Sequence, residues 1–253
     1  MHAPKAAMAL VILVGVMGLA ATAGGGEATT APACPVPHGS EHVRLDPRDF
    51  TTRIDNPYWP MRPGSRWVYR ETDPEGTTQR VVVTVTRRTK KIANGITARV
   101  VHDEATEHGV PVEVTEDWYA QDRCGSIWYL GEATAEYEHA KVVSTEGSFE
   151  AGVDGAEPGI VLPARPTVGL RYRQEHYTGH AEDRAEVASQ KEQVQVPFGY
   201  FAPGAVLMTR ELNPLEPKVL EFKFYARGVG PLLAIGISGG SDREELVSYV
   251  RGT

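Results

Sequence analysis

The chain has 253 residues, of which 41% are hydrophobic and 23% charged, and its 26 Lys and Arg against 33 Asp and Glu give a formal net charge of −7. An acidic surface with both signs interspersed argues against nucleic acid or anionic lipid as the main partner. Outside one N-terminal run, no stretch is apolar enough to cross a membrane, so we expect no membrane span once that run is removed.

The N-terminus has the order of features that marks a secretory signal peptide. Lys5 precedes an apolar run over residues 7–20, and Ala21-Thr22-Ala23 offers small residues for cleavage. The run is shorter than the roughly 20 apolar residues that span a bilayer, which favours a cleaved leader over an anchor. We therefore expect residues 1–23 to be removed and the mature protein to be secreted or otherwise extracytoplasmic.

Residues 24–42 are rich in Gly, Ala, Thr and Pro, which predicts a flexible linker ahead of a body that covers residues 43–253. The two cysteines, Cys34 and Cys124, both follow the leader. In an oxidising compartment an even pair favours a disulfide over a reactive thiol. Such a bond would tie the linker to the body and stabilise the fold by about 4 kcal/mol in the chain-entropy description.

From residue 43 onward, runs rich in Val, Thr and aromatic residues alternate with turns that contain Gly or Pro, a pattern typical of antiparallel strands. Asn94-Gly95 is a strong two-residue hairpin turn. Residues 112–132, VEVTEDWYAQDRCGSIWYLGE, predict a central hairpin whose two strands are joined by the polar turn 122–126. The other expected strands cover residues 65–71, 77–92, 96–105, 134–143, 148–150, 170–177, 185–196, 206–212, 219–226, 232–237 and 245–250.

Two segments are expected to be irregular. Residues 50–63 contain three prolines, so we expect an extended segment that lays Tyr58 and Trp59 over one end of the core. Residues 152–169 contain four glycines and three prolines, which predicts a loop that is either a lid or a disordered insertion.

About ten to twelve short strands without an amphipathic helix indicate an all-β fold. Hairpin after hairpin favours an antiparallel meander, and closure into a curved sheet, half-barrel or barrel would protect its edges. The sequence therefore predicts a single antiparallel β domain.

Common catalytic motifs are absent from the sequence, which has no GxSxG, GxxxxGK[ST], GxGxxG after a strand, HExxH or CxxC. His176 and His180 have a spacing that suits a metal on a helix, but a strand would hold them about 13 Å apart. Asp154 and Glu157 offer too few oxygens for calcium. We expect no metal site and no cofactor.

Acidic residues recur beside aromatic ones in the central hairpin and near residue 175. Two acids that converge inside a barrel can divide acid and base roles, because burial and mutual repulsion separate their pKa values. The same acids can instead pair with nearby Arg and Lys side chains or face solvent. The candidates for catalysis are Asp117, Tyr119, Glu175 and Tyr177.

Several stretches resemble a family of exported bacterial proteins with no established activity. They are NPYWP, PGSRWVY, EDWYAQDRCGSIWYLGE, GSFEAGVDGAEPGIVLPARP, YRQEHYTGHAED, PLEP and FYARGVGPL, and together they extend over residues 50–250. The resemblance implies an extracytoplasmic β-rich domain and supplies no catalytic residue. The closing pattern FYARGVGPLLAIG is similar to the last strands of lipoprotein-type curved β-sheet domains, an analogy of fold alone.

The first functional hypothesis is a binding protein for an apolar or amphipathic small ligand, held in an aromatic-lined concavity. The same rings can equally well fill the core of the barrel. The rings expected to line the concavity are Trp67, Tyr69, Trp118, Trp128, Tyr129, Tyr172 and Phe224.

Two further hypotheses remain open. A lyase, isomerase or glycan-active hydrolase would need two carboxyl groups about 5–10 Å apart in a cleft. A module that adds a peptide strand to its sheet would need an exposed edge with few charges, which the many charged residues in these strands disfavour.

Overall fold

The computed structural model describes residues 34–253, so the predicted signal peptide and the first part of the predicted linker lie outside the described residues. The described part of the chain contains no helix with the length and apolar character that crossing a bilayer requires. Its elements are η1 (Pro47–Asp49), β1 (Phe50–Thr51), β2 (Arg66–Thr72), β3 (Thr78–Lys91), β4 (Thr97–Glu107), β5 (Val110–Asp122), β6 (Ile127–Glu138), β7 (Lys141–Ser144), β8 (Phe149–Glu150), β9 (Glu157–Leu162), β10 (Arg171–Arg173), β11 (Glu175–His176), β12 (Arg184–Val196), β13 (Gly199–Leu212), β14 (Leu220–Ala226), β15 (Gly230–Ser238) and β16 (Arg243–Val250).

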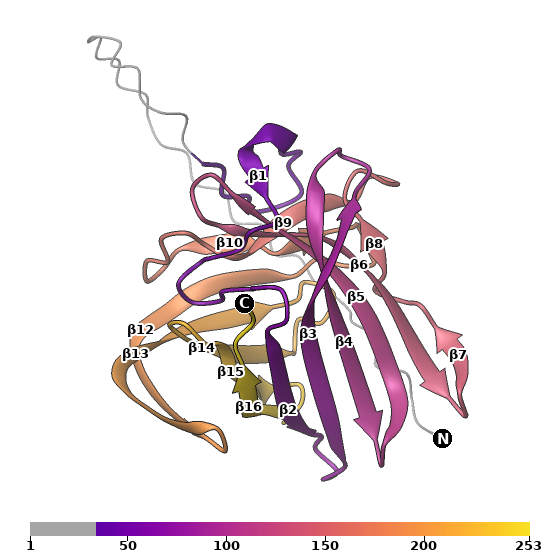
Figure 1. Ribbon diagram of the computed structural model, residues 1–253, viewed down its shortest axis with the longest axis vertical. Coiled ribbons are helices and arrows are strands. Elements are labelled where there is room, and N and C mark those ends of the chain that lie inside the picture. The colour runs from indigo at the N-terminus through magenta and orange to yellow at the C-terminus, as the bar shows by residue number, and fades with distance from the viewer. Residues whose placement is uncertain (1–33) are drawn as a thin grey trace.

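The strands form one antiparallel sheet with the order β10-β12-β13-β14-β15-β16-β2-β3-β4-β5-β6-β9-β11. Figure 1 shows the sheet curling from the orange β12 and β13 through the yellow β14 to β16 to the indigo and magenta β2 to β6. The two ends of this order, β10 and β11, are separated in the chain by Gln174 alone, so the sheet nearly closes on itself. The prediction of an all-β antiparallel meander that forms a curved sheet or barrel is confirmed.

The hairpins at residues 92–96 and 107–110 and the central hairpin follow the sequence prediction. Asn94 Oδ1 accepts a hydrogen bond from the backbone N–H of Ile96 at 3.0 Å, and Gly95 has a φ of +90° that its lack of a Cβ permits. In the central hairpin, Asp122 Oδ1 accepts from the N–H groups of Cys124 and Ser126, both at 2.9 Å, which fixes the turn between β5 and β6.

The prediction of a loop over residues 152–169 is wrong for its middle third. β9 lies within it, pairs with β6 and β11, and buries Ile160, Val161 and Leu162. The flanking glycines and prolines concealed this buried apolar run. Gly159 carries the closest approach, because a Cβ there would lie 2.3 Å from the carbonyl carbon of Gln174. The barrel wall closes at this glycine.

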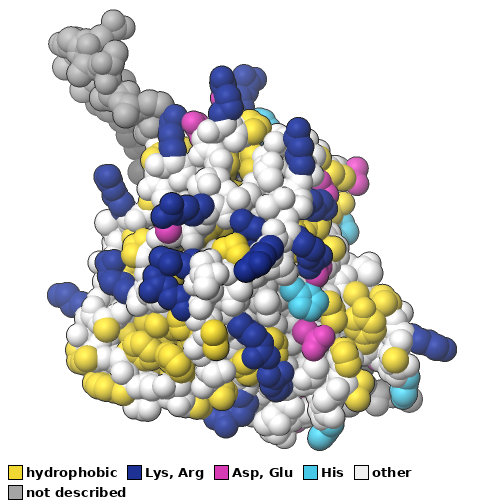
Figure 2. Space-filling model, in the orientation of Figure 1, with side chains coloured by type: hydrophobic (Ala, Val, Ile, Leu, Met, Phe, Trp, Pro, Cys, Tyr) yellow, Lys and Arg dark blue, Asp and Glu magenta, His cyan; other side chains and the backbone are white. Residues whose placement is uncertain are grey.

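Side chains alternate between the inner and outer faces of the sheet, as the period of two in a strand requires. On β2, Trp67 and Tyr69 are buried while Arg66 and Arg70 are exposed. Arg70 lies directly opposite Arg80 of β3, so the outer face carries neighbouring positive charges. Figure 2 shows dark blue Lys and Arg side chains spread over this face with few magenta Asp and Glu.

The N-terminal segment is held against the barrel by the predicted disulfide and by one buried arginine. Cys34 is bonded to Cys124 in the turn of the central hairpin, with their Cα atoms 6.3 Å apart. The guanidinium of Arg173, only 1% exposed, donates hydrogen bonds to the carbonyls of Gly39 and Glu41. The segment that follows Cys34 is therefore an ordered strap in the structure, whereas the sequence predicted a flexible linker as far as residue 42.

The extended segment after β1 also docks by polar contacts. Gln121 Oε1 accepts hydrogen bonds from the N–H groups of Asp55 and Asn56, both at 2.9 Å. The segment thereby places Tyr58, 5% exposed, and Trp59 against one end of the barrel.

Candidate functional site

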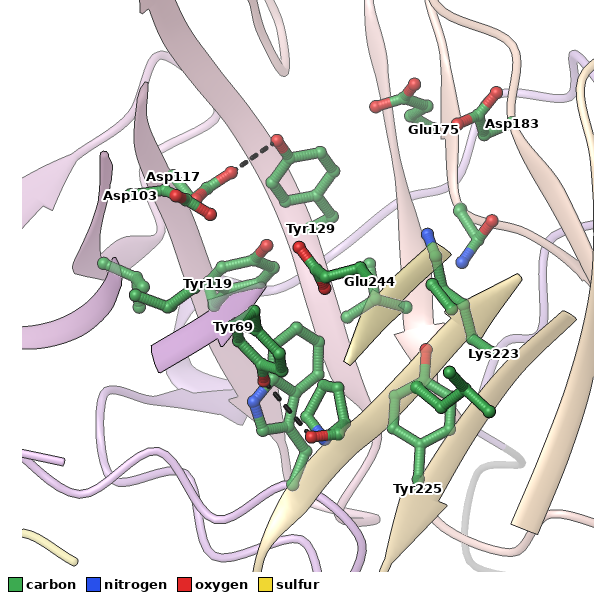
Figure 3. A pocket seen from close by; sticks show the side chains of 18 residues that line it. Tyr69, Asp103, Asp117, Tyr119, Tyr129, Glu175, Asp183, Lys223, Tyr225 and Glu244 are labelled. Atoms are coloured by element: carbon green, nitrogen blue, oxygen red, sulfur yellow. Dashed lines mark hydrogen bonds between the residues drawn. The ribbon is translucent and has the colours of Figure 1, made fainter. Parts of the chain in front are cut away.

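The interior of the barrel contains a cavity of about 280 Å³. Figure 3 shows carboxyl groups, phenol rings and one lysine facing it from strands on opposite sides of the barrel. The lining side chains are Trp59, Tyr69, Val83, Val101, Asp103, Asp117, Tyr119, Tyr129, Val161, Gln174, Glu175, Asp183, Lys223, Tyr225, Pro231, Leu233, Ala234 and Glu244.

One wall of the cavity carries a hydrogen-bonded trio on β5 and β6. Asp117 and Glu132 are directly opposite each other in the sheet, and the hydroxyl oxygen of Tyr129 lies 2.7 Å from Asp117 Oδ1 and 2.6 Å from Glu132 Oε2. A phenol has one proton to donate, so the second short contact requires a protonated carboxyl that donates to the phenol oxygen. The trio therefore holds a proton beyond that of the phenol.

Electrostatics agree with this proton count. Burial raises the pKa of Asp117 well above its ordinary value, and the neighbouring Glu132 and Asp103 raise it further. Burial likewise raises the pKa of Glu132 to about 7, although its contact with Tyr129 opposes the shift.

Asp103 on β4 and Glu244 on β16 line both the cavity and a larger outer hollow. Burial raises the pKa of Asp103 to about 7, and the neighbouring Glu113 raises it further. Burial raises the pKa of Glu244 to about 8, and Asp103 is the next cause of that shift. We call the larger hollow, about 680 Å³ in volume, the acidic vestibule. Its lining is Glu71, Gln79, Val81, Asp103, Ala105, Val112, Glu113, Glu136, Tyr137, Glu138, Val143, Ser144 and Glu244.

A second pair of acids, Glu175 and Asp183, faces the cavity from the closure of the barrel. The N–H of Glu175 donates to the carbonyl of Asp183, and Figure 3 shows their carboxyl groups near each other. Burial raises the pKa of Glu175 well above its ordinary value, with Asp183 as the next cause. Burial raises the pKa of Asp183 to about 6, and the cation of Lys223 limits that shift.

Lys223 on β14 is already surrounded by carboxylates. Its Nζ lies 3.3 Å from Glu221 Oε1 and 3.7 Å from Glu211 Oε2. Burial alone would lower the pKa of Lys223, but these two carboxylates outweigh it and hold the pKa well above its ordinary value. The amine is therefore charged and its charge is locally neutralised.

Aromatic rings close the other end of the cavity. The ring centroid of Trp59 lies 5.7 Å from that of Tyr119 and 6.2 Å from that of Tyr225. Tyr119 also stacks on Tyr129 at 5.0 Å. Gly230, with a φ of +113°, leaves room for Trp59, because a Cβ there would lie 2.8 Å from the indole Cδ1.

Several residues that the sequence predicted for a site line this cavity. Of the expected ligand-binding rings, Tyr69 and Tyr129 line it. Of the catalytic candidates, Asp117, Tyr119 and Glu175 line it.

The remaining expected residues lie elsewhere. Trp118 is on the opposite face of β5, where Lys90 Nζ sits 3.2 Å from its ring centroid. Trp128 lies beneath the N-terminal strap, where its indole N–H donates to Asp122 Oδ2 at 2.9 Å. Phe224 lies between two lining residues of β14 and therefore on the opposite face of that strand. The other side chains that are absent from the cavity lining are Trp67, which donates to the carbonyl of Val229, Tyr172, which is buried, and Tyr177, which stacks on His180.

The cavity also contains residues that sequence reasoning did not select for a site. Asp103, Asp183, Lys223 and Glu244 come from separate strands and hairpins and belong to no shared motif. One signal in the sequence could have identified them. A charged residue two positions from an aromatic one in a strand lies on the same face of the sheet, as Lys223 does with Tyr225.

Among residues 34–253, the only cluster of potential metal ligands comprises Cys34, Asp122 and Cys124. Its two sulfurs are joined in the disulfide, so this cluster offers no thiolate ligands. The cavity itself combines groups that can hold and release protons with aromatic faces, which suits ligand recognition or acid–base chemistry.

No family model matches the chain, and no curated protein matches it. The crystal structure of a "putative lipoprotein" from Parabacteroides distasonis ATCC 8503 is similar over 78% of this chain and 100% of that chain, with a TM-score of 0.40 and 10% sequence identity. A similarity at that level carries no argument about fold or function. The resemblance to exported bacterial proteins stays a prediction.

Proposed function

We propose that this is an extracytoplasmic protein that binds an amphipathic small molecule inside its barrel. The observation that carries the proposal is the cavity of about 280 Å³, which has apolar and aromatic walls at one end and polar groups at the other. Ligand sites are concave and mostly apolar with a few convergent polar groups, and pocket volumes begin at roughly 300 Å³, so this cavity suits a small ligand.

The proposed location outside the cytoplasm has one support in the structure, the Cys34–Cys124 disulfide. Disulfides form and persist mainly in oxidising compartments. The predicted leader points to the same compartment.

Native mass spectrometry of the protein purified from its own host tests the proposal. We expect an extra mass that is lost on denaturation. Ala234→Phe would fill the cavity, because Ala234 lies in its lining, and should abolish the extra mass. Ala133→Phe is the matched control, because Ala133 is exposed on the same face as Glu116. A bare polypeptide mass for the wild type, or equal retention by both variants, would count against the proposal.

A carboxylate-dependent enzyme, as a lyase, isomerase or glycan-active hydrolase, is the second candidate. It is favoured by the contact of one phenol with two carboxyl groups, Asp117 and Glu132, whose pKa values are both raised by burial. Raised pKa values in a cavity suit a general acid. Turnover that is lost in Asp117→Asn and Glu175→Gln would select this candidate over simple binding.

A further inference from the structure

The charge balance of the cavity points to the chemical class of its ligand. Within the described residues, the lining contains five carboxyl groups against a single amine. The amine belongs to Lys223, which already contacts Glu211 and Glu221 of the adjoining wall. The carboxyl groups of the lining are Asp103, Asp117, Glu175, Asp183 and Glu244.

Two polar side chains of the lining, Tyr119 and Asp117, are 7% and 8% exposed. Both side chains face the cavity in Figure 3. Polar groups that converge on a largely apolar pocket orient the polar part of a ligand, so these side chains favour a ligand with a polar group at this position.

The aromatic end suits a cation as well as an apolar group. Trp59 packs against Tyr119 and Tyr225 with interplanar angles of 56° and 51°, and all three side chains line the cavity. The face of an aromatic ring attracts an ammonium group, and several rings around one space form a known mode of recognition for organic cations.

The outer hollow that adjoins the cavity is also lined by acidic residues. The acidic vestibule shares Asp103 and Glu244 with the cavity, so the two spaces adjoin at these carboxyl groups. A cleft lined by one sign of charge concentrates ligands of the opposite sign at its mouth.

We propose that the ligand is an organic cation, a protonated amine whose nitrogen lies among Asp117, Tyr119 and the neighbouring acids while its apolar part contacts the aromatic end. This inference rests on the proposed binding function and specifies its ligand class. The anionic groups of a carboxylate or phosphate ligand find no uncommitted cation in the lining within the described chain, because Lys223 is paired.

Binding of the amine should therefore release protons from the carboxyl groups of the cavity. The two short contacts of the Asp117–Tyr129–Glu132 trio require one shared proton besides that of the phenol. A bound ammonium favours the ionised carboxylates and releases protons, so affinity should rise with pH while the amine stays charged. The groups that face the site are Asp103, Asp117, Tyr119, Tyr129, Glu132, Glu175, Asp183, Lys223 with Glu211 and Glu221, Tyr225 and Glu244.

Three small probes of similar shape and different charge test the inference. They are 2-phenylethylamine, 2-phenylethanol and phenylacetate, titrated into the full mature protein by ligand-observed NMR at pH 8. We expect the amine to bind at least tenfold more tightly than the alcohol and the carboxylate to bind least. The affinity for the amine should fall severalfold between pH 8 and pH 6.

Matched amide variants locate the site. Asp117→Asn and Asp183→Asn should each weaken the amine about tenfold, while Glu116→Gln on the outer face should leave its affinity unchanged. Thermal melts establish that each variant is folded, and Glu175→Gln replaces any that is not.

The outcomes separate the inference from the proposed function. Equal or tighter binding of the alcohol or carboxylate overturns the cation inference and leaves the small-ligand function standing. A preference for the amine that survives both inner amide variants overturns the placement of the nitrogen. No binding by any probe, together with a bare mass for the protein from its host, overturns both proposals.

Discussion

Two adjacent acids on β5 have opposite surroundings. Glu116 faces outward, where its carboxylate lies 2.6 Å from Arg88 Nη2 and 2.7 Å from His102 Nδ1. Asp117 faces inward, where its Oδ1 lies 2.7 Å from the phenol oxygen of Tyr129. The outer acid is balanced by a cation of the protein, and the inner acid is balanced by a proton or, as we propose, by a ligand.

The same contrast holds for the sheet as a whole. Among the charged side chains on the face in Figure 2, Lys and Arg predominate, although the chain has a net charge of −7. Much of the acidity is instead directed into the barrel and the acidic vestibule. A fold selected only for stability would place carboxylates in water or beside arginines, because a buried charge without a partner is costly. The inner face therefore accepts a cost in stability, which is typical of functional sites.

The largest expected effect comes from removing the disulfide that ties the N-terminal strap to the barrel. Replacing Cys34 and Cys124 together by Ser should lower the free energy of unfolding by about 4 kcal/mol, because the disulfide closes a loop with a sequence separation of 90. Urea denaturation measures the change. A reducing agent should destabilise the wild type and leave the double variant unaffected. A decrease in the free energy of unfolding of less than about 1 kcal/mol would mean that Arg173 and the other contacts hold the strap without the disulfide.

The next effect comes from opening the wall. Gly159→Ala should cost about 3 kcal/mol, because the new Cβ would meet backbone atoms of Gln174, which cannot move without breaking the pairing of β9 with β11. Gly199→Ala is the matched control, since a Cβ there meets nothing within 4 Å. Denaturation midpoints report both changes, and equal stability of the two variants would show that closure at Gly159 tolerates a side chain.

The contrast between faces also explains what the sequence could predict. Turn chemistry identified the hairpins, because Asn94-Gly95 and the Asp122 turn act locally. Which side chains face inward depends on strand parity, and nearly every residue from Thr115 to Asp122 is buried on one face or the other. Composition therefore could not separate Trp118, which points outward, from Tyr119, which points into the cavity.

Register irregularities added to this difficulty. The pairing of β5 with β6 shifts between Asp117 and Tyr119, so parity counted along β6 from the turn does not carry through to Glu132. Asp103 and Glu244 lie far apart in sequence and come near each other only because β16 pairs with β2, which continues the sheet through β3 to β4. Such long-range placement leaves no local sequence signal.

The two faces should respond to pH in opposite directions. An acid whose pKa is raised by folding binds more protons in the folded state, so stability falls as pH rises from its unfolded pKa to its folded pKa. For the unliganded protein, Asp183, Asp103 and Glu244, with pKa values of about 6, 7 and 8, predict falling stability between pH 5 and pH 8. On the outer face, Arg70 and Arg243 lower the pKa of Glu245 despite partial burial, so its contribution is lost only as pH falls below about 4.5.

Glu244→Gln tests this reversal. The amide cannot ionise, so the variant should be more stable than the wild type at pH 8 by on the order of 2 kcal/mol, a value reduced because water in the vestibule screens the carboxylate. At pH 5 the two proteins should be equally stable. Thermal melts across this range measure the difference, and a variant that is less stable at pH 8 would show that Glu244 is stabilised as a carboxylate.

The smallest effect separates the two neighbours on β5. Glu116→Gln should cost about 0.5–1 kcal/mol, because it weakens an exposed ion pair with Arg88 and a contact with His102. Asp117→Asn should leave stability at pH 8 unchanged or raised, because Asn can accept the hydrogen bond from Tyr129 and needs no proton at this buried position. The loss in Glu116→Gln should shrink in 1 M salt, where surface pairs are screened, while Asp117→Asn should respond little. Equal salt sensitivity in both variants would contradict the assignment of one acid to solvent and the other to the enclosed cavity.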